Sequence, residues 1–312
     1  MPSVNTVLGP IPVEKLGRTR MHEHLFISYP GSEWDFLNPF DKEATLKEVV
    51  GLMNTLKARG VSTVVEATPI TLGRNHEFLV AVAEASGMNI IASTGFYTRR
   101  GGLPDYFASM DVDGLAEMME RELTQGMMGS TVKAGVIKVA SGVDKIVRSE
   151  ERVLRAAARV YKATGLPIIT HTDVGTLGGQ QLDIFQSEGA DLSRIVIGHT
   201  CCSSDIKNYL TILKRGAYAG FDRIGWELFQ SEEVRVVAVA GLIGAGYANR
   251  MTLSQDSIAG WEGNPRFMPP AEEVRRVTYL EDVFIPRLLK GGISQKTVDQ
   301  IFIDNPRHIF GG

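Results

Sequence analysis

The chain has 312 residues, of which 44% are hydrophobic and 22% charged, so it can bury the core of a globular protein. A formal net charge of -3 argues against a nucleic-acid surface, and no apolar run is long enough to span a bilayer. The two cysteines are adjacent, and the N-terminus lacks the pattern of a secretion signal. We therefore expect a cytoplasmic protein with neither membrane nor nucleic-acid partners.

Taken in chain order, residues 4–17 predict a β-hairpin, and short runs rich in Val and Ile then alternate with amphipathic segments. Eight runs predict strands, at 19–25, 61–67, 89–95, 134–140, 167–171, 194–199, 217–221 and 251–256. Helical periodicity is found over 42–59, 75–86, 112–125, 150–164 and 204–215. A long loop at 257–270, a closing helix at 272–291 and a tail at 305–312 that packs back on the barrel complete the prediction.

Apolar strands separated by helices predict a parallel sheet that is covered on both faces. Eight such units in 312 residues predict a (β/α)₈ TIM barrel, with one domain over residues 1–312 and the hairpin at its start. No linker or low-complexity tract divides the chain.

Histidines stand at the carboxyl ends of several predicted strands, which is where active sites form in this barrel. His22 and His24 are two residues apart and share one face of the first strand, with Glu23 on the other. His171 ends the fifth strand and His199 the sixth, and Asp256 ends the eighth. Imidazole and carboxylate groups suit a divalent metal such as zinc.

The number of candidate ligands points to two metal ions. Four His and one Asp exceed the needs of one tetrahedral ion, and paired ions about 3.5–4 Å apart hold a hydroxide between them. Lys138 is a charged residue in the apolar run AGVIKVAS. A buried lysine tends to lose its proton, and its neutral amine can react with carbon dioxide to give a carbamate, which would bridge the ions as a carboxylate does.

Each of these residues also has a structural interpretation when it is taken alone. A single histidine could belong to the core, Lys138 could reach solvent or form a salt bridge, and Asp256 could cap a helix. The joint placement on one rim favours the metal site. His76 and His308, outside this rim, are interpreted as structural or solvated.

The order His22-x-His24, Lys138, His171 in THTD, His199 in IGHT and Asp256 resembles the amidohydrolase superfamily, and more narrowly the phosphotriesterase family with its phosphotriesterase-like lactonases. The resemblance extends from MHEH to DNPRHIF near the end of the chain. It implies two divalent ions (zinc, cobalt, iron or manganese) bridged by a carboxylated Lys138. It also implies that His22, His24 and Asp256 hold the more buried ion, and His171 and His199 the more exposed one.

The same resemblance implies the catalytic roles. A hydroxide between the ions would be the nucleophile, Asp256 would take its proton, and the exposed ion would polarise the carbonyl or phosphoryl oxygen. Tyr97 in TGFYTRR and Arg223 in GFDRIG match substrate-side residues of the lactonases, although an aromatic core residue and a surface charge are the structural alternatives. Trp261 and Phe267 could line a channel for an acyl chain.

One departure concerns the sixth strand, where lactonases carry an aspartate in GHxGD and this chain reads GHTCCSSD. Cys202 occupies the place of that relay aspartate, and Asp205 follows three residues later. The proton relay is therefore expected to differ here, and a contact of Cys201 or Cys202 with a metal is an alternative role.

Together these features predict a lactonase that opens N-acyl homoserine lactones or related lactones, a quorum-quenching activity, with phosphotriester hydrolysis as a side reaction. The competing interpretations are an organophosphate or carboxylic ester hydrolase of the same family and a metal-binding scaffold without catalysis. Family members are commonly homodimers, so a homodimer is expected by resemblance.

Overall fold

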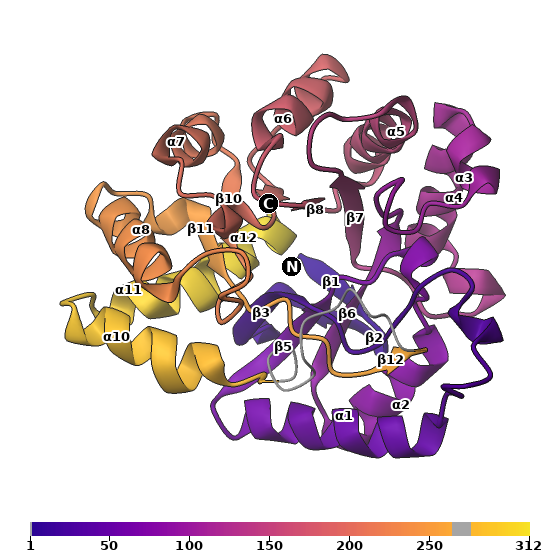
Figure 1. The fold of residues 1–312 in the computed structure, drawn as a ribbon, viewed down its shortest axis with the longest axis horizontal. Coiled ribbons are helices and arrows are strands. Elements are labelled where there is room, and N and C mark those ends of the chain that lie inside the picture. The colour runs from indigo at the N-terminus through magenta and orange to yellow at the C-terminus, as the bar shows by residue number, and fades with distance from the viewer. Residues whose placement is uncertain (1, 264–275) are drawn as a thin grey trace.

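Eight parallel strands surrounded by helices form the body of the protein in a computed structural model that describes residues 2–263 and 276–312 (Figure 1). Neighbouring strands pair in the order β3 (Arg18–Glu23), β5 (Val61–Glu66), β6 (Asn89–Gly95), β7 (Val136–Ser141), β8 (Ile168–Thr172), β9 (Ile195–Ile197), β10 (Tyr218–Phe221) and β11 (Met251–Leu253). Each overlaps one of the predicted runs. The predicted (β/α)₈ barrel is confirmed.

The helices form a ring outside the strands (Figure 1). They are α1 (Lys42–Lys57), α2 (His76–Ser86), α3 (Asp105–Ser109), α4 (Val112–Thr124), α5 (Arg148–Thr164), α6 (Gly178–Ser187), α7 (Ile206–Lys214), α8 (Glu232–Gly244), α10 (Ile285–Lys290), α11 (Gln295–Asp299) and α12 (Asn305–Gly311). Side-chain caps start several of them: Asp41 accepts a hydrogen bond from Ala44 N, and Asn75 from Phe78 N. Within the described ranges, no helix combines the length and apolar character that crossing a membrane requires.

Two segments differ in detail from the predicted elements. Of the helix predicted over 272–291, the described part begins with a coil and turn at 276–278 and becomes a π-helix at Leu280–Phe284 before α10. The tail is itself helical: a second π-helix at Gln300–Asp304 runs into α12. As predicted, α12 packs against the barrel, at β11, and it also contacts β1 (Ser3–Thr6) of the hairpin. β1 pairs in antiparallel fashion with β2 (Gly9–Pro12), so the predicted hairpin is present.

Apolar side chains fill the barrel interior at its amino-terminal end. Val136 of β7 and Ile169 of β8 belong to this inner cluster, together with Ile309 of α12 and Val4 of the hairpin. Successive residues of a strand alternate between its faces, so Lys138 and His171, each two residues further on, share the inward face. The pattern that fills the barrel bottom therefore also directs polar groups into its mouth.

The barrel closes between its first and last strands at this same mouth. Asp256 N donates to His22 O at 3.1 Å, and His24 N donates to Ser257 O at 2.8 Å. The short strands β4 (Ile27–Ser28) and β12 (Trp261–Glu262) continue this contact as a parallel pair. The segments that carry three predicted ligands are thus hydrogen-bonded to each other.

Candidate metal centre and substrate pocket

All six predicted ligands are buried at the carboxyl ends of the strands. They come from five strands or the residues that directly follow them: His22 and His24 from β3, Lys138 from β7, His171 from β8, His199 after β9 and Asp256 after β11. The structure brings them together in one cluster.

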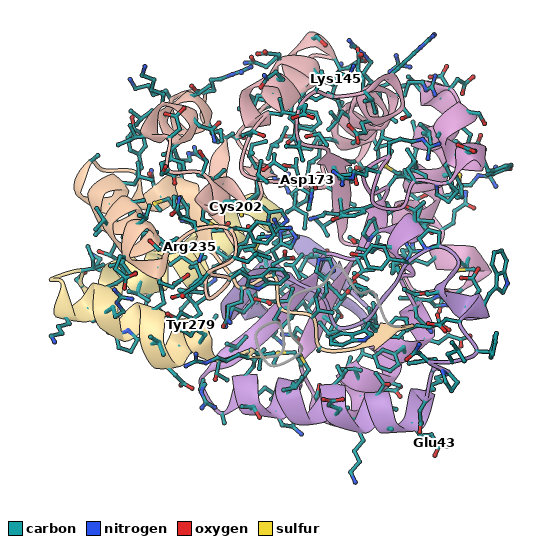
Figure 2. The ribbon with its side chains drawn as sticks, viewed as in Figure 1. Glu43, Lys145, Asp173, Cys202, Arg235 and Tyr279 are labelled. Atoms are coloured by element: carbon teal, nitrogen blue, oxygen red, sulfur yellow. The ribbon has the colours of Figure 1, made fainter. Side chains whose placement is uncertain are left out.

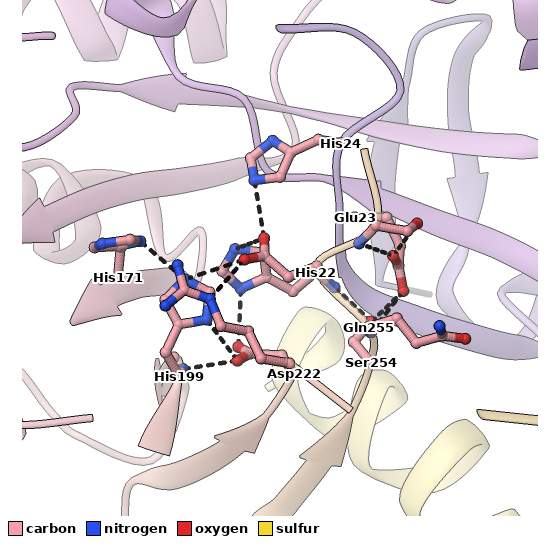
Figure 3. Close-up of polar contacts among 12 residues, drawn as sticks. His22, Glu23, His24, His171, His199, Asp222, Ser254 and Gln255 are labelled. Carbon is pink, nitrogen blue, oxygen red and sulfur yellow. Dashed lines mark hydrogen bonds and ion pairs between the residues drawn. The ribbon is translucent and has the colours of Figure 1, made fainter. Parts of the chain in front are cut away.

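The first part of the cluster gathers around one carboxylate oxygen (Figure 3). Asp256 Oδ1 lies 3.1 Å from His24 Nε2 and 3.5 Å from His22 Nε2. Lys138 Nζ lies 2.7 Å from the same His22 nitrogen. Although Asp256 Oδ1 is buried, it accepts no hydrogen bond from the described residues. His22, His24 and Asp256 match the set that the resemblance assigned to the more buried ion, and Lys138 lies beside them.

The second part of the cluster consists of two imidazoles that face each other. His171 Nδ1 lies 2.8 Å from His199 Nε2, and their rings are nearly perpendicular. Asp256 Oδ2 lies 3.7 Å from His199 Nε2, so the aspartate stands between the two parts. Atoms of His22, His199 and Asp256 lie within 4.8 Å of one another, a spacing that one metal ion could bridge.

Asp222, which was not predicted from the sequence, accepts hydrogen bonds from two of these histidines, at the ring nitrogens that point away from the cluster. Its Oδ2 lies 2.9 Å from His22 Nδ1, and its Oδ1 lies 2.8 Å from His199 Nδ1 (Figure 3). His199 N also donates to Oδ1 at 2.7 Å. Asp222 directly follows β10, so its position at the end of a strand was the signal that could have identified it.

Hydrogen bonds to carboxylates determine which nitrogen of His171 and of His199 is left to bind a metal. Burial lowers the pKa of His199 well below its usual value and that of His171 to about 4, so both rings are neutral at pH 7. A neutral ring has one N–H, which His199 donates from Nδ1 to Asp222 and His171 donates from Nε2 to Asp173. Two lone pairs then face each other at 2.8 Å. A cation relieves this repulsion, so the donor set fits a metal.

The charge balance of the cluster fits the same conclusion. Burial alone would raise the pKa of Asp256, but the contact with His24 and the positive charge of Arg223 hold that pKa well below its usual range, so Asp256 is a carboxylate. Burial lowers the pKa of Lys138 to about 8, so part of the lysine is a neutral amine near neutral pH. A neutral amine is the form that reacts with carbon dioxide.

Two of the candidate ligands adopt backbone conformations that residues other than glycine rarely adopt. The φ angle is 59° at His199 and 52° at Asp256, both in the left-handed region. Such strain persists where surrounding contacts overdetermine it, and it concentrates at functional sites. For Asp256 these contacts come from Glu23, which accepts hydrogen bonds from the backbone N of Gln255 at 3.0 Å and of Ser257 at 2.8 Å.

A pocket of about 760 Å³ opens directly above the cluster. His24, His171 and Asp256 form part of its floor, and its walls are largely apolar, with Ile27, Leu72, Trp226, Leu228, Phe229 and Ile258. An apolar cavity with a few convergent polar groups is the usual form of a small-molecule site.

Tyr97 and Arg223 both line this pocket beside the cluster. The Tyr97 ring lies 4.9 Å from that of His171, edge to face. Arg223 Nε donates to Asp256 Oδ2 at 2.9 Å, and its guanidinium lies 4.3 Å from the centre of the Phe229 ring. Both side chains therefore line the pocket next to the candidate ligands.

The other selected residues lie further from the cluster or outside the description. Trp261 packs in β12 against a cluster that contains Ile258, but it is not among the residues that line the pocket. Phe267 lies outside the described residues. Cys202 is buried inside the ring of helices, with its Sγ 3.7 Å from Arg223 Nη1 (Figure 2). Asp205 caps α7 instead, where it accepts from Lys207 N at 2.9 Å.

A buried cluster of imidazoles and a carboxylate in the mouth of a (β/α)₈ barrel, beneath an open pocket, defines a metal-dependent hydrolase. A sequence profile of the Phosphotriesterase family matches residues 2–310, and the chain belongs to this family. Membership implies a centre of divalent metal ions and hydrolysis of phosphotriester or lactone ester bonds. The family resemblance seen in the sequence is confirmed.

Similar proteins cover nearly the whole chain. A phosphotriesterase homology protein from Mycobacterium tuberculosis is 36% identical over 99% of this chain and 98% of its own length. The structure of an organophosphorus hydrolase from Deinococcus radiodurans superposes with a TM-score of 0.94 at 40% identity, covering 99% of this chain and 97% of the other. A mutant of a PTE-like lactonase from the same organism gives 0.93 at 40% identity, covering 99% and 100%.

Proposed function

We propose that this protein is a lactonase that opens N-acyl homoserine lactones or related lactones, with phosphotriester hydrolysis as a secondary activity. The observation that carries the proposal is the placement of Tyr97 and Arg223 on the pocket wall, beside the cluster. The apolar walls suit an acyl chain, and the polar floor suits a lactone ring. Such an activity would degrade quorum signals.

The proposed metal centre holds two divalent ions, of zinc, cobalt, iron or manganese. His22, His24 and Asp256 would hold the more buried ion, His171 and His199 the more exposed one, and Lys138 would join them as a carbamate. The bound ions would supply the Lewis acidity that activates water and polarises the scissile carbonyl.

The residues of the chain would supply the proton transfers and the orientation. Asp256 is ionised and faces the cluster, so it can take the proton of the attacking water. Burial and the nearby Tyr29 raise the pKa of Tyr97 well above its usual value, so its hydroxyl stays protonated and can donate a hydrogen bond to the substrate. Arg223 fixes the second oxygen of Asp256 at the pocket edge.

The proton relay expected of the family ends differently in this chain. Cys202 contacts Arg223 but is not an acid of the strength of aspartate, and Asp205 is occupied as a helix cap. We propose that the proton leaves Asp256 through water in the open pocket instead, and that neither cysteine binds a metal.

The decisive experiment measures metal content and hydrolysis on the same preparation. The protein loaded with zinc or cobalt should hold two ions per chain and hydrolyse a long-chain acyl homoserine lactone with a higher kcat/KM than it shows for a phosphotriester or a simple carboxylic ester. Faster turnover of the phosphotriester or the ester would favour the competing hydrolase assignments. Two bound ions without hydrolysis of any of the three would overturn the enzymatic proposal and favour a scaffold.

The carbamate has its own test. The variant Lys138→Ala should lose more than about 100-fold in kcat/KM, since loss of even an indirect contact to a metal ligand costs about 10–100-fold. Acetate or propionate should restore part of the rate, because a small carboxylate can replace the bridge. Lys145→Ala, on an exposed loop, is the matched control. Full activity and metal content in Lys138→Ala would contradict the assignment.

We further propose that the protein is a homodimer. Trp34, Phe36 and Leu37, which follow β4, are exposed to 79%, 85% and 77%, an unusual concentration of large apolar side chains on a surface. Sedimentation should give twice the mass of the chain, and Phe36→Glu should shift it toward the monomer. A wild-type protein that sediments as a monomer would exclude the dimer.

A further inference from the structure

We infer that Asp173 is a positioning residue that directs His171 toward the more exposed metal ion and thereby sets the affinity of that ion. The inference rests on the proposed role of His171 as a ligand. It concerns a residue for which neither the sequence analysis nor the family membership provides a role.

The first observation is a short contact at the end of β8. Asp173 Oδ1 lies 2.6 Å from His171 Nε2. Asp173 begins the turn that directly follows β8 (Ile168–Thr172), and this turn places its carboxylate beside the His171 ring. The carboxylate can therefore reach the ring nitrogen that points away from the cluster.

The second observation is the direction of the opposite nitrogen. His171 Nδ1 points at His199 Nε2, 2.8 Å away. His171 can bind a metal there only if its proton stays on Nε2, and Asp173 is the carboxylate that accepts this proton in a hydrogen bond. Asp173 thus does for His171 what Asp222 does for His22 and His199.

The third observation explains why a residue at the pocket rim is held firmly enough for this role. Arg223 Nη1 donates to the backbone O of Asp173 at 2.8 Å, and its Nε donates to Asp256 Oδ2 at 2.9 Å. One guanidinium therefore joins the segment that carries Asp173 to Asp256, the candidate ligand that lies between the two parts of the cluster. Figure 2 shows Asp173 inside the ring of helices, unlike the peripheral Lys145 and Glu43.

The two carboxylates differ in their access to solvent, and this difference has a consequence. The side chain of Asp222 is 1% exposed, whereas that of Asp173 is 24% exposed and lines the pocket. Water competes with the Asp173 hydrogen bond but cannot reach Asp222. The protein should therefore bind the more exposed ion with the lower affinity of the two, and this affinity should depend on Asp173.

The test titrates metal-free protein with Co²⁺ and follows its visible absorption, which does not require catalysis. In Asp173→Ala the affinity for the second equivalent should fall about 10–100-fold, while the first equivalent binds as in the wild type. Asp173→Asn keeps an acceptor oxygen without the charge, so its loss should be smaller. Asp144→Asn, an exposed residue on the preceding strand–helix loop, should leave both affinities unchanged.

Thermal unfolding of the metal-free variants separates positioning from stability. A rim carboxylate that is partly exposed should contribute little to folding, so Asp173→Ala should unfold within about 2 °C of the wild type. Unchanged binding of both equivalents in Asp173→Ala, or equal weakening of both, would overturn the inference. A wild type that binds two ions but hydrolyses no lactone would defeat the proposed function and leave this inference standing.

Discussion

His22 Nδ1 lies 2.9 Å from Asp222 Oδ2, and this contact determines which nitrogen of His22 faces the cluster. The other oxygen of Asp222 holds His199 in the same way, so one carboxylate orients an imidazole from each part of the proposed centre. A histidine ligand is defined as much by the partner of its far nitrogen as by its own position.

The first prediction concerns Asp222→Asn. Asparagine has one acceptor oxygen and one NH₂ group, so one of the two histidines would meet a donor and its proton would be driven to the nitrogen that should bind metal. Metal affinity and kcat/KM should both fall about 10–100-fold. Equilibrium dialysis and steady-state kinetics measure the two effects. Asp113→Asn, in an exposed ion pair, is the control, and wild-type metal binding in Asp222→Asn would refute the assigned role.

The second prediction concerns the acid stability of the metal-free protein. The pKa of His171 is lowered to about 4 by burial, whereas an unfolded histidine titrates near 6.5. Between these values the unfolded chain binds the proton and the folded chain does not, so stability falls as the pH falls through this window. At about 1.4 kcal/mol per pH unit, His171 should contribute a loss of about 3 kcal/mol between pH 6.5 and 4.

Urea unfolding of the chelated protein at several pH values measures this loss. The difference between the wild type and His171→Gln isolates the contribution of this residue, because the other titrating groups are common to both. A parallel pH dependence in the two proteins would show that His171 is not held neutral by the fold.

The barrel and its cluster could be predicted because both depend on short-range patterns. Val136 and Lys138, and likewise Ile169 and His171, lie two apart in strands, so the positions that pack the barrel interior also identify the inward polar residues. Eight apolar runs then sufficed to place His199 and Asp256 at the same rim.

The partners of the ligands were not predicted, because they depend on contacts between distant segments. Asp222 and His22 are 200 residues apart. The position of Asp222 after a predicted strand could have marked it as a site residue, but nothing in GFDRIG identifies the two imidazoles that it contacts. The left-handed backbone at Asp256 is equally hidden, since aspartate does not require it. The register shift between Arg20 and Glu23, where β3 pairs with β5, also leaves no clear mark in the sequence.

The third prediction concerns Arg223→Met. Methionine fills a similar volume against Phe229 but removes the hydrogen bonds to Asp256 Oδ2 and to the backbone O of Asp173. A hydrogen bond to a charged group contributes about 1.5–3 kcal/mol, so kcat/KM for the lactone should fall about 10–100-fold.

Steady-state kinetics at a fixed metal content measure this change. Arg121→Met removes an exposed helical ion pair and should leave kcat/KM unaltered. Undiminished lactone hydrolysis by Arg223→Met would mean that the arginine only packs against the aromatic wall.

The last prediction concerns Glu23, whose carboxylate accepts hydrogen bonds from the backbone on both sides of Asp256. Its Oε1 accepts from Ser254 Oγ at 2.8 Å and from Gln255 N, and its Oε2 accepts from Ser257 N and Oγ. In Glu23→Gln an NH₂ group would replace one of the acceptors and meet the donors of Ser257. The strained turn at Asp256 should relax, and affinity for the more buried ion should fall about 10–100-fold.

A matched control is needed because Glu23 is buried and its loss will also lower the free energy of unfolding. The control is Glu122→Gln. Glu122 is another buried glutamate, on α4, which forms an ion pair with Arg74 and lies away from the metal cluster. Both variants should be less stable in urea, by about 1–3 kcal/mol for an unsatisfied buried group, but only Glu23→Gln should weaken metal binding. Equal metal affinity in the two variants would mean that Glu23 has only a structural role. A selective loss in Glu23→Gln would show that this glutamate, between His22 and His24, positions Asp256 after the last strand.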